Sequence, residues 1–301
     1  MWGGTDEAQS VKAIRAAIDE GVTLIDTAPA YGLGKAEEIV GEAIAGRRDE
    51  VVIATKCGLV WHTGKGTHFF DENGQRVHRY LGRDSIFVEV EQSLRRLRTD
   101  YIDLYITHWQ DTTTPVAETM GALLDLKRQG KIRAIGVSNV MPGTLKEYMA
   151  IGQVDAIQER FSMIDRGVES DLLPICRKNN VSVLSYSSLA LGLLSGKIGP
   201  GRTFEGDDLR KDDPRFAPAS LGRVASFMKE IEPVAASRQA TPAQIVIAWT
   251  VARPGITYAL CGARNPEQAA ENAVAGRLSL SADEIARIDA AIARHLVGID
   301  G

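Results

Sequence analysis

The chain has 301 residues, of which 44% are hydrophobic and 25% are charged, as in ordinary globular proteins. Its formal net charge is −4 and it has no basic run, which argues against nucleic acid or an anionic membrane as a partner. The three cysteines, Cys57, Cys176 and Cys261, are far apart and lack metal-binding spacing, as expected in a reducing compartment. No apolar run approaches the roughly 20 residues of a membrane span and no signal peptide opens the chain, so we expect a cytoplasmic protein.

Apolar strand-like runs alternate with amphipathic helical patterns along the whole chain. Buried strands are expected at 22–26, 51–55, 101–106, 132–136, 154–158, 181–186 and 256–261. Helices are expected at 6–20, 35–47, 84–98, 115–130, 142–151, 168–179, 220–238, 241–253, 265–275 and 281–297. The helix at 84–98 should turn Val88, Val90, Leu94 and Leu97 inward. Helix starts are indicated by Thr241 before a proline and by a capping box from Ser281 to Glu284.

Repeated strand–helix units predict a parallel sheet. A doubly wound sheet would carry a glycine-rich dinucleotide turn after an early strand, and no such turn is present. Polar residues follow many different strands, which favours a single (β/α)₈ TIM barrel domain over 1–301, because all its strand ends face one mouth. Only seven strands are found, so we expect the first barrel strand to be missing. Two long polar segments, 58–82 and 197–216, are expected to be lids or disordered loops.

Four ionisable residues stand at or just after the ends of three early strands: Asp26, Tyr31, Lys56 and His108. A phenol has a pKa near 10, but a cation held close stabilises the phenolate and lowers that pKa. We therefore expect Lys56 to activate Tyr31 as an acid and Asp26 to pair with Lys56. His108 could then bind a substrate oxygen or share in the proton transfer. The set suits protonation of a carbonyl oxygen while another group attacks the carbon.

Each of these residues also has a structural explanation when it is taken alone. Asp26 could cap a turn, and Tyr31 could be a packed loop aromatic. Lys56 could pair with a carboxylate for stability, and His108 could be a core histidine. Their joint placement at the same ends of consecutive strands favours the catalytic interpretation.

These motifs carry a family resemblance over essentially the whole chain. Asp26-Thr-Ala-x-x-Tyr31-Gly, Lys56, His108-Trp and Gly136-Val-Ser-Asn139 occur in this order, and the set resembles the aldo-keto reductase superfamily. Within it the chain is most similar to bacterial reductases related to potassium-channel β subunits. The resemblance implies a barrel that binds NADPH, with Tyr31 as general acid, Lys56 lowering its pKa, Asp26 supporting Lys56 and His108 orienting the carbonyl.

The resemblance also implies a set of cofactor-binding residues. Ser138, Asn139 and Gln158 would hold the carboxamide, and Tyr186 would stack on the nicotinamide ring. The pyrophosphate would be wrapped by the loop of Ser187, Leu189, Leu191, Gly192 and Lys197. The adenosine end would contact Gly262, Ala263, Arg264, Gln268, Glu271 and Asn272. Arg264 could grip a 2′-phosphate, which favours NADPH. Turn chemistry, core packing or a solvated arginine would explain these residues equally well one by one.

The implied activity is reduction of small aldehydes and ketones to alcohols, with Trp61 and Trp109 as substrate-binding residues. The same aromatic side chains could instead pack their loop. Two other functions stay open: a cofactor-binding regulatory subunit of the channel β-subunit type, and an inactive truncated barrel.

Overall fold

The structure is a computed structural model that describes residues 6–199, 201–205 and 208–299. The chain divides into two compact units. One, called here the sheet unit, comprises Ile14–Glu159 and Pro174–Val183. The other, called here the helix unit, comprises Met1–Ala13, Arg160–Leu173 and Leu184–Gly301. The predictions of a single barrel domain and of a missing first strand stay predictions.

The sheet unit contains parallel strands that match the predicted ones. They are β1 (Leu24–Asp26), β2 (Val52–Cys57), β6 (Ile102–Thr107), β7 (Ile132–Ser138) and β8 (Ala156–Arg160). With β9 (Ser182–Tyr186) and β10 (Tyr258–Ala259) they make one seven-stranded sheet of order β1-β2-β6-β7-β8-β9-β10. The strands from β1 to β8 in this sheet pair in parallel, as do β9 and β10, and Asp26 lies opposite Ala54 while Lys56 lies opposite Ile106. This register brings the carboxyl ends of neighbouring strands to one edge, as the strand pattern predicted.

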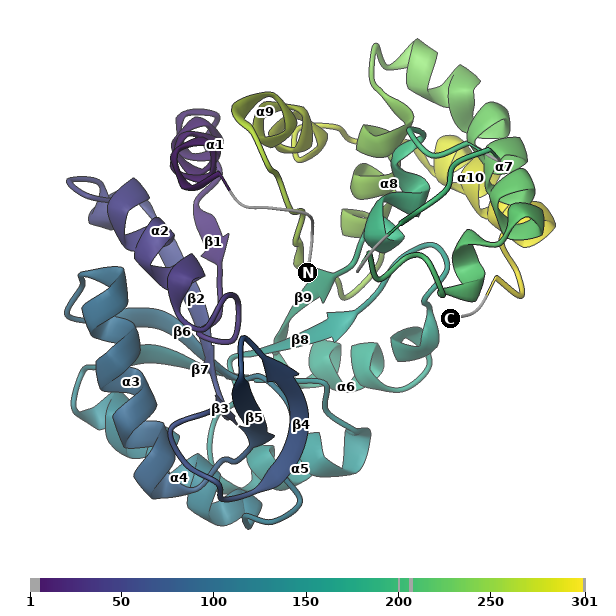
Figure 1. Cartoon of the computed structure of the whole chain (residues 1–301). Coiled ribbons are helices and arrows are strands. Elements are labelled where there is room, and N and C mark those ends of the chain that lie inside the picture. The colour runs from purple at the N-terminus through teal and green to yellow at the C-terminus, as the bar shows by residue number, and fades with distance from the viewer. Residues whose placement is uncertain (1–5, 200, 206–207, 300–301) are drawn as a thin grey trace. The chain divides into compact units, whose positions relative to one another are not determined.

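Helices connect the strands of the sheet unit. They are α1 (Glu7–Asp19), α2 (Lys35–Ala43), α3 (Arg83–Leu97), α4 (Val116–Arg128), α5 (Pro142–Ile151) and α6 (Leu172–Asn179), with the 3₁₀ turn η1 (Arg48–Glu50). The first residues of α1 and α6 and the 3₁₀ turn η2 (Gly167–Glu169) belong to the helix unit. Figure 1 shows α2, α3 and α4 side by side along β2, β6 and β7. The sheet side of this layer buries apolar side chains such as Ile53, Ile86 and Leu126, whose removal from water is the main stabilising contribution.

The inward face of α3 differs from the predicted one. Val90 and Leu97 are fully buried, but Val88 is 43% exposed, so its inward placement was wrong. Glu89 is buried instead. Its carboxylate accepts hydrogen bonds from the Gly58 backbone N–H at 2.8 Å and the Ser85 hydroxyl at 3.0 Å. These bonds make burial of a carboxyl group tolerable, and they rotate the helix away from Val88.

The segment 58–82 is not the disordered or lid-like loop that its polarity suggested. It forms β3 (Leu59–Val60), β4 (Thr67–Glu72) and β5 (Gln75–Arg79), an antiparallel sheet of order β3-β5-β4. Asn73 and Gly74 join β4 to β5 with φ of 49° and 76°. Positive φ at both central residues is the geometry of a two-residue type I′ hairpin turn, for which Asn-Gly is the preferred pair. We call β4, the turn and β5 the hairpin.

The helix unit contains four long helices after a loop-rich start. They are α7 (Pro218–Ser237), α8 (Pro242–Val251), α9 (Pro266–Ala275) and α10 (Ala282–His295), preceded by η3 (Ala190–Ser195) and η4 (Pro214–Phe216). The predicted cap at Thr241 and capping box at Ser281 are confirmed, the former as a full capping box with Gln244. Trp249 is fully buried and stacks on Phe161 at 6.1 Å between ring centroids. Within the described ranges, no helix is long and apolar enough to span a bilayer.

Candidate functional site

Lys56 is the centre of the polar network at the strand ends of the sheet unit. Its side chain is fully buried, and its ammonium lies 2.8 and 3.0 Å from the two carboxylate oxygens of Asp26. A third hydrogen bond runs to the Thr27 carbonyl oxygen at 2.7 Å. Burial alone would lower the pKa of Lys56, but the charges of Asp26 and Tyr31 and their hydrogen bonds outweigh burial and raise it. The predicted pairing of Asp26 with Lys56 is thereby confirmed.

Tyr31 faces this buried cation from an exposed position. Its side chain follows β1 on a tight turn, in which its N–H donates to the Ala28 carbonyl at 3.1 Å. The Lys56 Nζ atom lies 5.2 Å from the centroid of the phenol ring, while Tyr31 as a residue is 41% exposed. The Tyr31 side chain can therefore contact a ligand that arrives from solvent, while the buried Lys56 ammonium lies on its inner side.

His108 lies beside Tyr31 in an edge-on arrangement, with ring centroids 5.7 Å apart. Its backbone N–H donates to the Cys57 carbonyl at 2.9 Å, which ties the loop after β6 to the end of β2. Burial, and then the charge of Lys56, lower the pKa of His108 well below its usual range. The imidazole is therefore neutral at pH 7. Its Nδ1 atom is buried and has no hydrogen-bond partner in the described part of the chain.

Ser138, Asn139 and Gln158 form a connected group at the ends of β7 and β8. Ser138 lies opposite Gln158 in the parallel register, and its hydroxyl donates to the Gln158 carbonyl at 2.6 Å. The Asn139 side chain donates to the His108 carbonyl at 2.8 Å and to the Ser138 hydroxyl at 3.1 Å. Gln158 donates from Nε2 to the Asp26 carboxylate at 2.7 Å. The structure thus joins the predicted carboxamide group to the predicted catalytic group.

Sequence reasoning missed two groups that support this network. The Gln110 amide donates to the Ser138 carbonyl at 2.9 Å and fixes the segment after His108. Glu37 is fully buried behind β2, where it accepts from Thr55 at 2.6 Å and pairs with Arg96 at 2.7 Å. Gln110 could have been suspected from its place in Thr107-His-Trp-Gln. Glu37 carries no such signal, because acidic residues on helices usually face solvent.

The two predicted substrate-binding residues lie where the hairpin meets the catalytic group. Trp61 and Trp109 are partly buried against a cluster of Ala30, Leu59 and Val77. Ala30 precedes Tyr31 and Trp109 follows His108, so this cluster adjoins both residues in sequence. Trp109 also contacts Phe69 of β4, with ring centroids 5.3 Å apart. The hairpin therefore flanks the exposed side of the network.

The predicted pyrophosphate loop lies in the helix unit, after β9. Tyr186 ends that strand and Ser187 begins the loop. Ser187, Ala190 and Leu191 have positive φ (59°, 46° and 57°), as does Gly192. For residues with side chains this backbone is unfavourable, and such strain is concentrated at ligand-binding loops. The amides of Ala190 and Gly192 donate within the loop, to Ser187 and Leu189.

The predicted adenosine-binding residues surround the start of α9. The Arg264 N–H donates to Gln268 Oε1 at 2.9 Å, and the Asn272 side chain donates to the Gly262 carbonyl at 3.2 Å. Ala263 lies between them in this turn, and the Arg264 side chain is exposed. Glu271 binds Lys197 of the preceding loop at 2.9 Å, so the structure brings these two predicted segments together.

The predicted residues therefore fall into two sets. Asp26, Tyr31, Lys56, His108, Ser138, Asn139 and Gln158 lie in the sheet unit with Trp61 and Trp109, and the structure assembles them. The residues from Tyr186 to Asn272 lie in the helix unit, and each set is described within its own unit.

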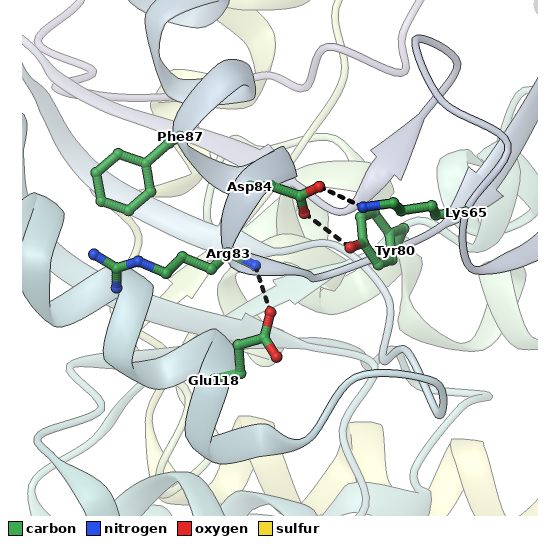
Figure 2. A pocket seen from close by; sticks show the side chains of 6 residues that line it. All are labelled: Lys65, Tyr80, Arg83, Asp84, Phe87 and Glu118. Atoms are coloured by element: carbon green, nitrogen blue, oxygen red, sulfur yellow. Dashed lines mark hydrogen bonds and ion pairs between the residues drawn. The ribbon is translucent and has the colours of Figure 1, made fainter.

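A separate hollow of about 520 Å³ in the sheet unit contains none of the predicted residues. It is lined by Lys65, Tyr80, Arg83, Asp84, Phe87 and Glu118 (Figure 2). Asp84 accepts from Lys65 at 2.7 Å and from the Tyr80 hydroxyl at 2.8 Å, and Glu118 accepts from the Arg83 N–H at 3.0 Å. Because Asp84 is paired with Lys65 and the Arg83 guanidinium with Asp125 outside the lining, this hollow is a weaker candidate for a site than the Lys56 network.

Comparison with known proteins gives the same family throughout. A model of the aldo/keto reductase family matches residues 1–293. The aldo-keto reductase YhdN of Bacillus subtilis is 44% identical over 271 residues, covering 89% of this chain and 78% of that protein. The NADH-specific methylglyoxal reductase of Escherichia coli is 39% identical over 285 residues, covering 93% and 86%.

Solved structures of related enzymes superpose on this chain. The glycerol dehydrogenase of Gluconobacter oxydans matches with a TM-score of 0.90 and 39% identity, covering 98% of this chain and 88% of that one. An aldo-keto reductase from Klebsiella pneumoniae in complex with NADPH matches with a TM-score of 0.72 and 32% identity, covering 96% and 86%.

Proposed function

The chain belongs to the aldo/keto reductase family, and we propose that it is an NADPH-dependent oxidoreductase that reduces aldehydes and ketones with Tyr31 as general acid. The observation that carries this proposal is the contrast between the fully buried Lys56 ammonium and the exposed Tyr31 ring 5.2 Å from it. Relatives named as reductases support carbonyl reduction as the reaction.

The proton transfer follows from the placement of Lys56. Tyr31 donates its hydroxyl proton to the carbonyl oxygen while the carbonyl carbon takes a hydride, so that the C=O group becomes an alcohol. The tyrosine is left with a negative charge, which the buried Lys56 ammonium stabilises electrostatically. Asp26 and the Thr27 carbonyl hold that ammonium in place. Solvent then returns a proton to the Tyr31 oxygen.

His108 serves as a positioning group for the substrate in this proposal. A histidine whose pKa lies well below the usual range is not protonated to the imidazolium at pH 7, so it is a poor acid. Tyr31 is then left as the acid. A neutral imidazole can still donate one hydrogen bond to the carbonyl oxygen. Its edge-on contact with Tyr31 keeps both groups beside one another.

The residues present fit a nicotinamide cofactor. Bound NADPH would supply the hydride. The polar side chains of Ser138, Asn139 and Gln158 suit a carboxamide, and Tyr186 offers a ring face. The strained loop from Ser187 through Leu189, Leu191 and Gly192 to Lys197 suits a pyrophosphate. Gly262, Ala263, Arg264, Gln268, Glu271 and Asn272 are assigned to adenosine.

The choice of NADPH over NADH is supported by Arg264, whose exposed guanidinium can bind a 2′-phosphate in bidentate fashion. The relatives use both cofactors, since the Klebsiella enzyme is described with NADPH and the E. coli enzyme as NADH-specific.

The decisive experiment is Tyr31→Phe, assayed by NADPH oxidation with a panel of aldehydes and ketones. We expect kcat to fall by about 10²- to 10⁴-fold, the usual contribution of a general acid, while NADPH still quenches tryptophan fluorescence. Tyr258→Phe is the matched control, because it removes one hydroxyl from another exposed tyrosine (46%). Turnover retained by Tyr31→Phe would reject Tyr31 as the acid. A folded wild-type protein that binds neither NADPH nor NADH would reject the oxidoreductase itself.

A further inference from the structure

Arg79 is a half-buried cation without a counter-charge. It ends β5, and its guanidinium lies 5.0 Å from the centroid of the Phe69 ring. Its Nε atom is buried and has no hydrogen-bond partner, and no carboxylate of the described residues pairs with it. Two neighbouring carboxylates already have partners, Asp84 with Lys65 and Asp71 with His68.

This cation lies close to the proposed active site. The Phe69 ring on which Arg79 stacks contacts Trp109, and Trp109 directly follows His108. In the hairpin register Arg79 lies opposite Thr67 and Leu59, at the end remote from the Asn73-Gly74 turn. Leu59 belongs to the apolar cluster that also contains Ala30, the neighbour of Tyr31. The Arg79 guanidinium thus lies on the side of the Lys56 network that the hairpin flanks.

Physical chemistry indicates what such a group would bind. A buried Nε–H donor without a partner is costly, because it loses water and gains nothing in return. The planar fork of arginine matches the two oxygens of a carboxylate or the oxygens of a phosphate. Glu72, also in the hairpin, has a buried carboxylate oxygen without a hydrogen-bond partner among the described residues. It does not come within ion-pair distance of Arg79. The described residues therefore provide no paired anion for Arg79.

We propose that Arg79 binds an oxyanion, a carboxylate or phosphate, carried by the substrate away from its carbonyl group. The proposal rests on the proposed reductase function and deepens it, because it names the class of carbonyl compound that the hairpin selects. Neutral aldehydes remain substrates but lack this contact.

The test uses pairs of aldehydes that differ in one charged group: benzaldehyde with 4-carboxybenzaldehyde, and glyceraldehyde with glyceraldehyde 3-phosphate. We expect wild-type kcat/KM to favour at least one anionic member by about 10- to 100-fold, the usual effect of one charge-assisted hydrogen-bond pair. Arg79→Met should remove this preference and change kcat/KM for the neutral member less than about 3-fold. The pair that responds tells carboxylate from phosphate.

Two variants control the test. Arg76→Met removes an exposed arginine from the same strand and should leave the preference unchanged. Arg79→Lys keeps the charge without the fork and should restore part of it. Calorimetric titration of the protein with 4-(hydroxymethyl)benzoate and with benzyl alcohol measures the preference without turnover.

The outcomes separate the two proposals. Absence of both NADPH and NADH oxidation with every aldehyde would overturn the reductase function, while the calorimetric preference would still test the role of Arg79. If neither anionic aldehyde is preferred and the benzoate binds no better than benzyl alcohol, the Arg79 proposal is wrong. Equal losses for charged and neutral substrates in Arg79→Met would also overturn it, because they would show that Arg79 only supports the hairpin.

Discussion

Two lysine–carboxylate pairs of nearly equal length lie in different surroundings. Lys56 and Asp26, in the sheet unit, are 2.8 Å apart with side chains 0% and 16% exposed. Lys197 and Glu271, in the helix unit, are 2.9 Å apart with side chains 65% and 24% exposed. Water screens the second pair and leaves the first almost unscreened. Similar distances therefore do not imply similar behaviour. Lys56 is held in place, whereas the exposed Lys197 can exchange Glu271 for a ligand.

The same contrast extends to the backbone around each lysine. Lys56 lies within β2, a strand that pairs with both β1 and β6, and Lys56 itself lies opposite Ile106 of β6. Lys197 follows a loop in which Ser187, Ala190 and Leu191 adopt left-handed backbone conformations. Chemistry that requires a fixed charge is thus placed on strands, whereas the proposed phosphate contacts are placed on a loop.

The largest expected effect is that of Lys56→Met. It leaves the Asp26 carboxylate largely buried without its cation, which should lower the free energy of unfolding by about 3–5 kcal/mol and abolish turnover. Urea denaturation followed by circular dichroism measures the first effect. Adding Asp26→Asn should recover part of the stability but none of the turnover. If Lys56→Met unfolds at the wild-type urea concentration, the buried pair does not have the importance assigned to it.

Glu89 tests the buried layer behind the Lys56 strand. Burial raises the pKa of Glu89 to about 8, although the bonds from Gly58 and Ser85 oppose the rise. The folded chain therefore keeps a proton that the unfolded chain releases near pH 4.5. This stabilising contribution is complete below pH 4.5 and is lost as pH rises towards 8.

Between pH 6 and 8, the ionisation of Glu89 should accordingly lower the free energy of unfolding of the wild-type protein by about 1 kcal/mol per pH unit. Glu89→Gln cannot titrate and should remove that part of the slope in urea titrations. Glu91→Gln, on the exposed side of the same helix, should keep the wild-type slope. A Glu89→Gln slope equal to that of wild type would show that Glu89 is ionised in the folded protein.

Arg264→Ala addresses the helix unit and should have a smaller effect. Loss of a charged contact to a 2′-phosphate should raise KM for NADPH about 10-fold and leave KM for NADH within about 2-fold. Arg287→Ala, an exposed arginine on α10, is the matched control. Equal changes for both cofactors would count against recognition of the 2′-phosphate by Arg264.

The smallest effect on stability is expected for Lys197→Ala. An ion pair this exposed contributes about 0–1 kcal/mol, so Tm should change by less than about 3 °C. KM for NADPH should nevertheless rise several-fold if the lysine exchanges Glu271 for a phosphate. A large fall in Tm would remove the contrast with Lys56.

The sequence allowed the seven strands and the Asp26–Lys56 pair to be predicted, because parallel strands bring their carboxyl ends to one edge. The roles of these residues stay predictions. The hairpin was missed although Asn73-Gly74 is a strong turn signal, because the high polarity of 58–82 was given more weight. The signal was present and could have been used.

Other features could not have been derived from local pattern. Helical periodicity predicts that Val88 is buried and Glu89 exposed. The structure has the opposite, with Glu89 accepting hydrogen bonds from the Gly58 N–H just after β2 and from the Ser85 hydroxyl. Whether a buried atom such as Arg79 Nε or His108 Nδ1 lacks a hydrogen-bond partner depends on the positions of all its neighbours in space. That information exists only once the chain has folded.

The hydrogen bond between Gln158 and Asp26 joins residues 132 positions apart. Closing so long a span costs chain entropy before the contact gives anything back, so contacts of this kind tend to form late in folding. During synthesis the Asp26 carboxylate leaves the ribosome long before the amide that completes its surroundings. The site at this end of the molecule is therefore expected to be complete only late in folding. Partly folded chains should be inactive even where their first strands have already paired.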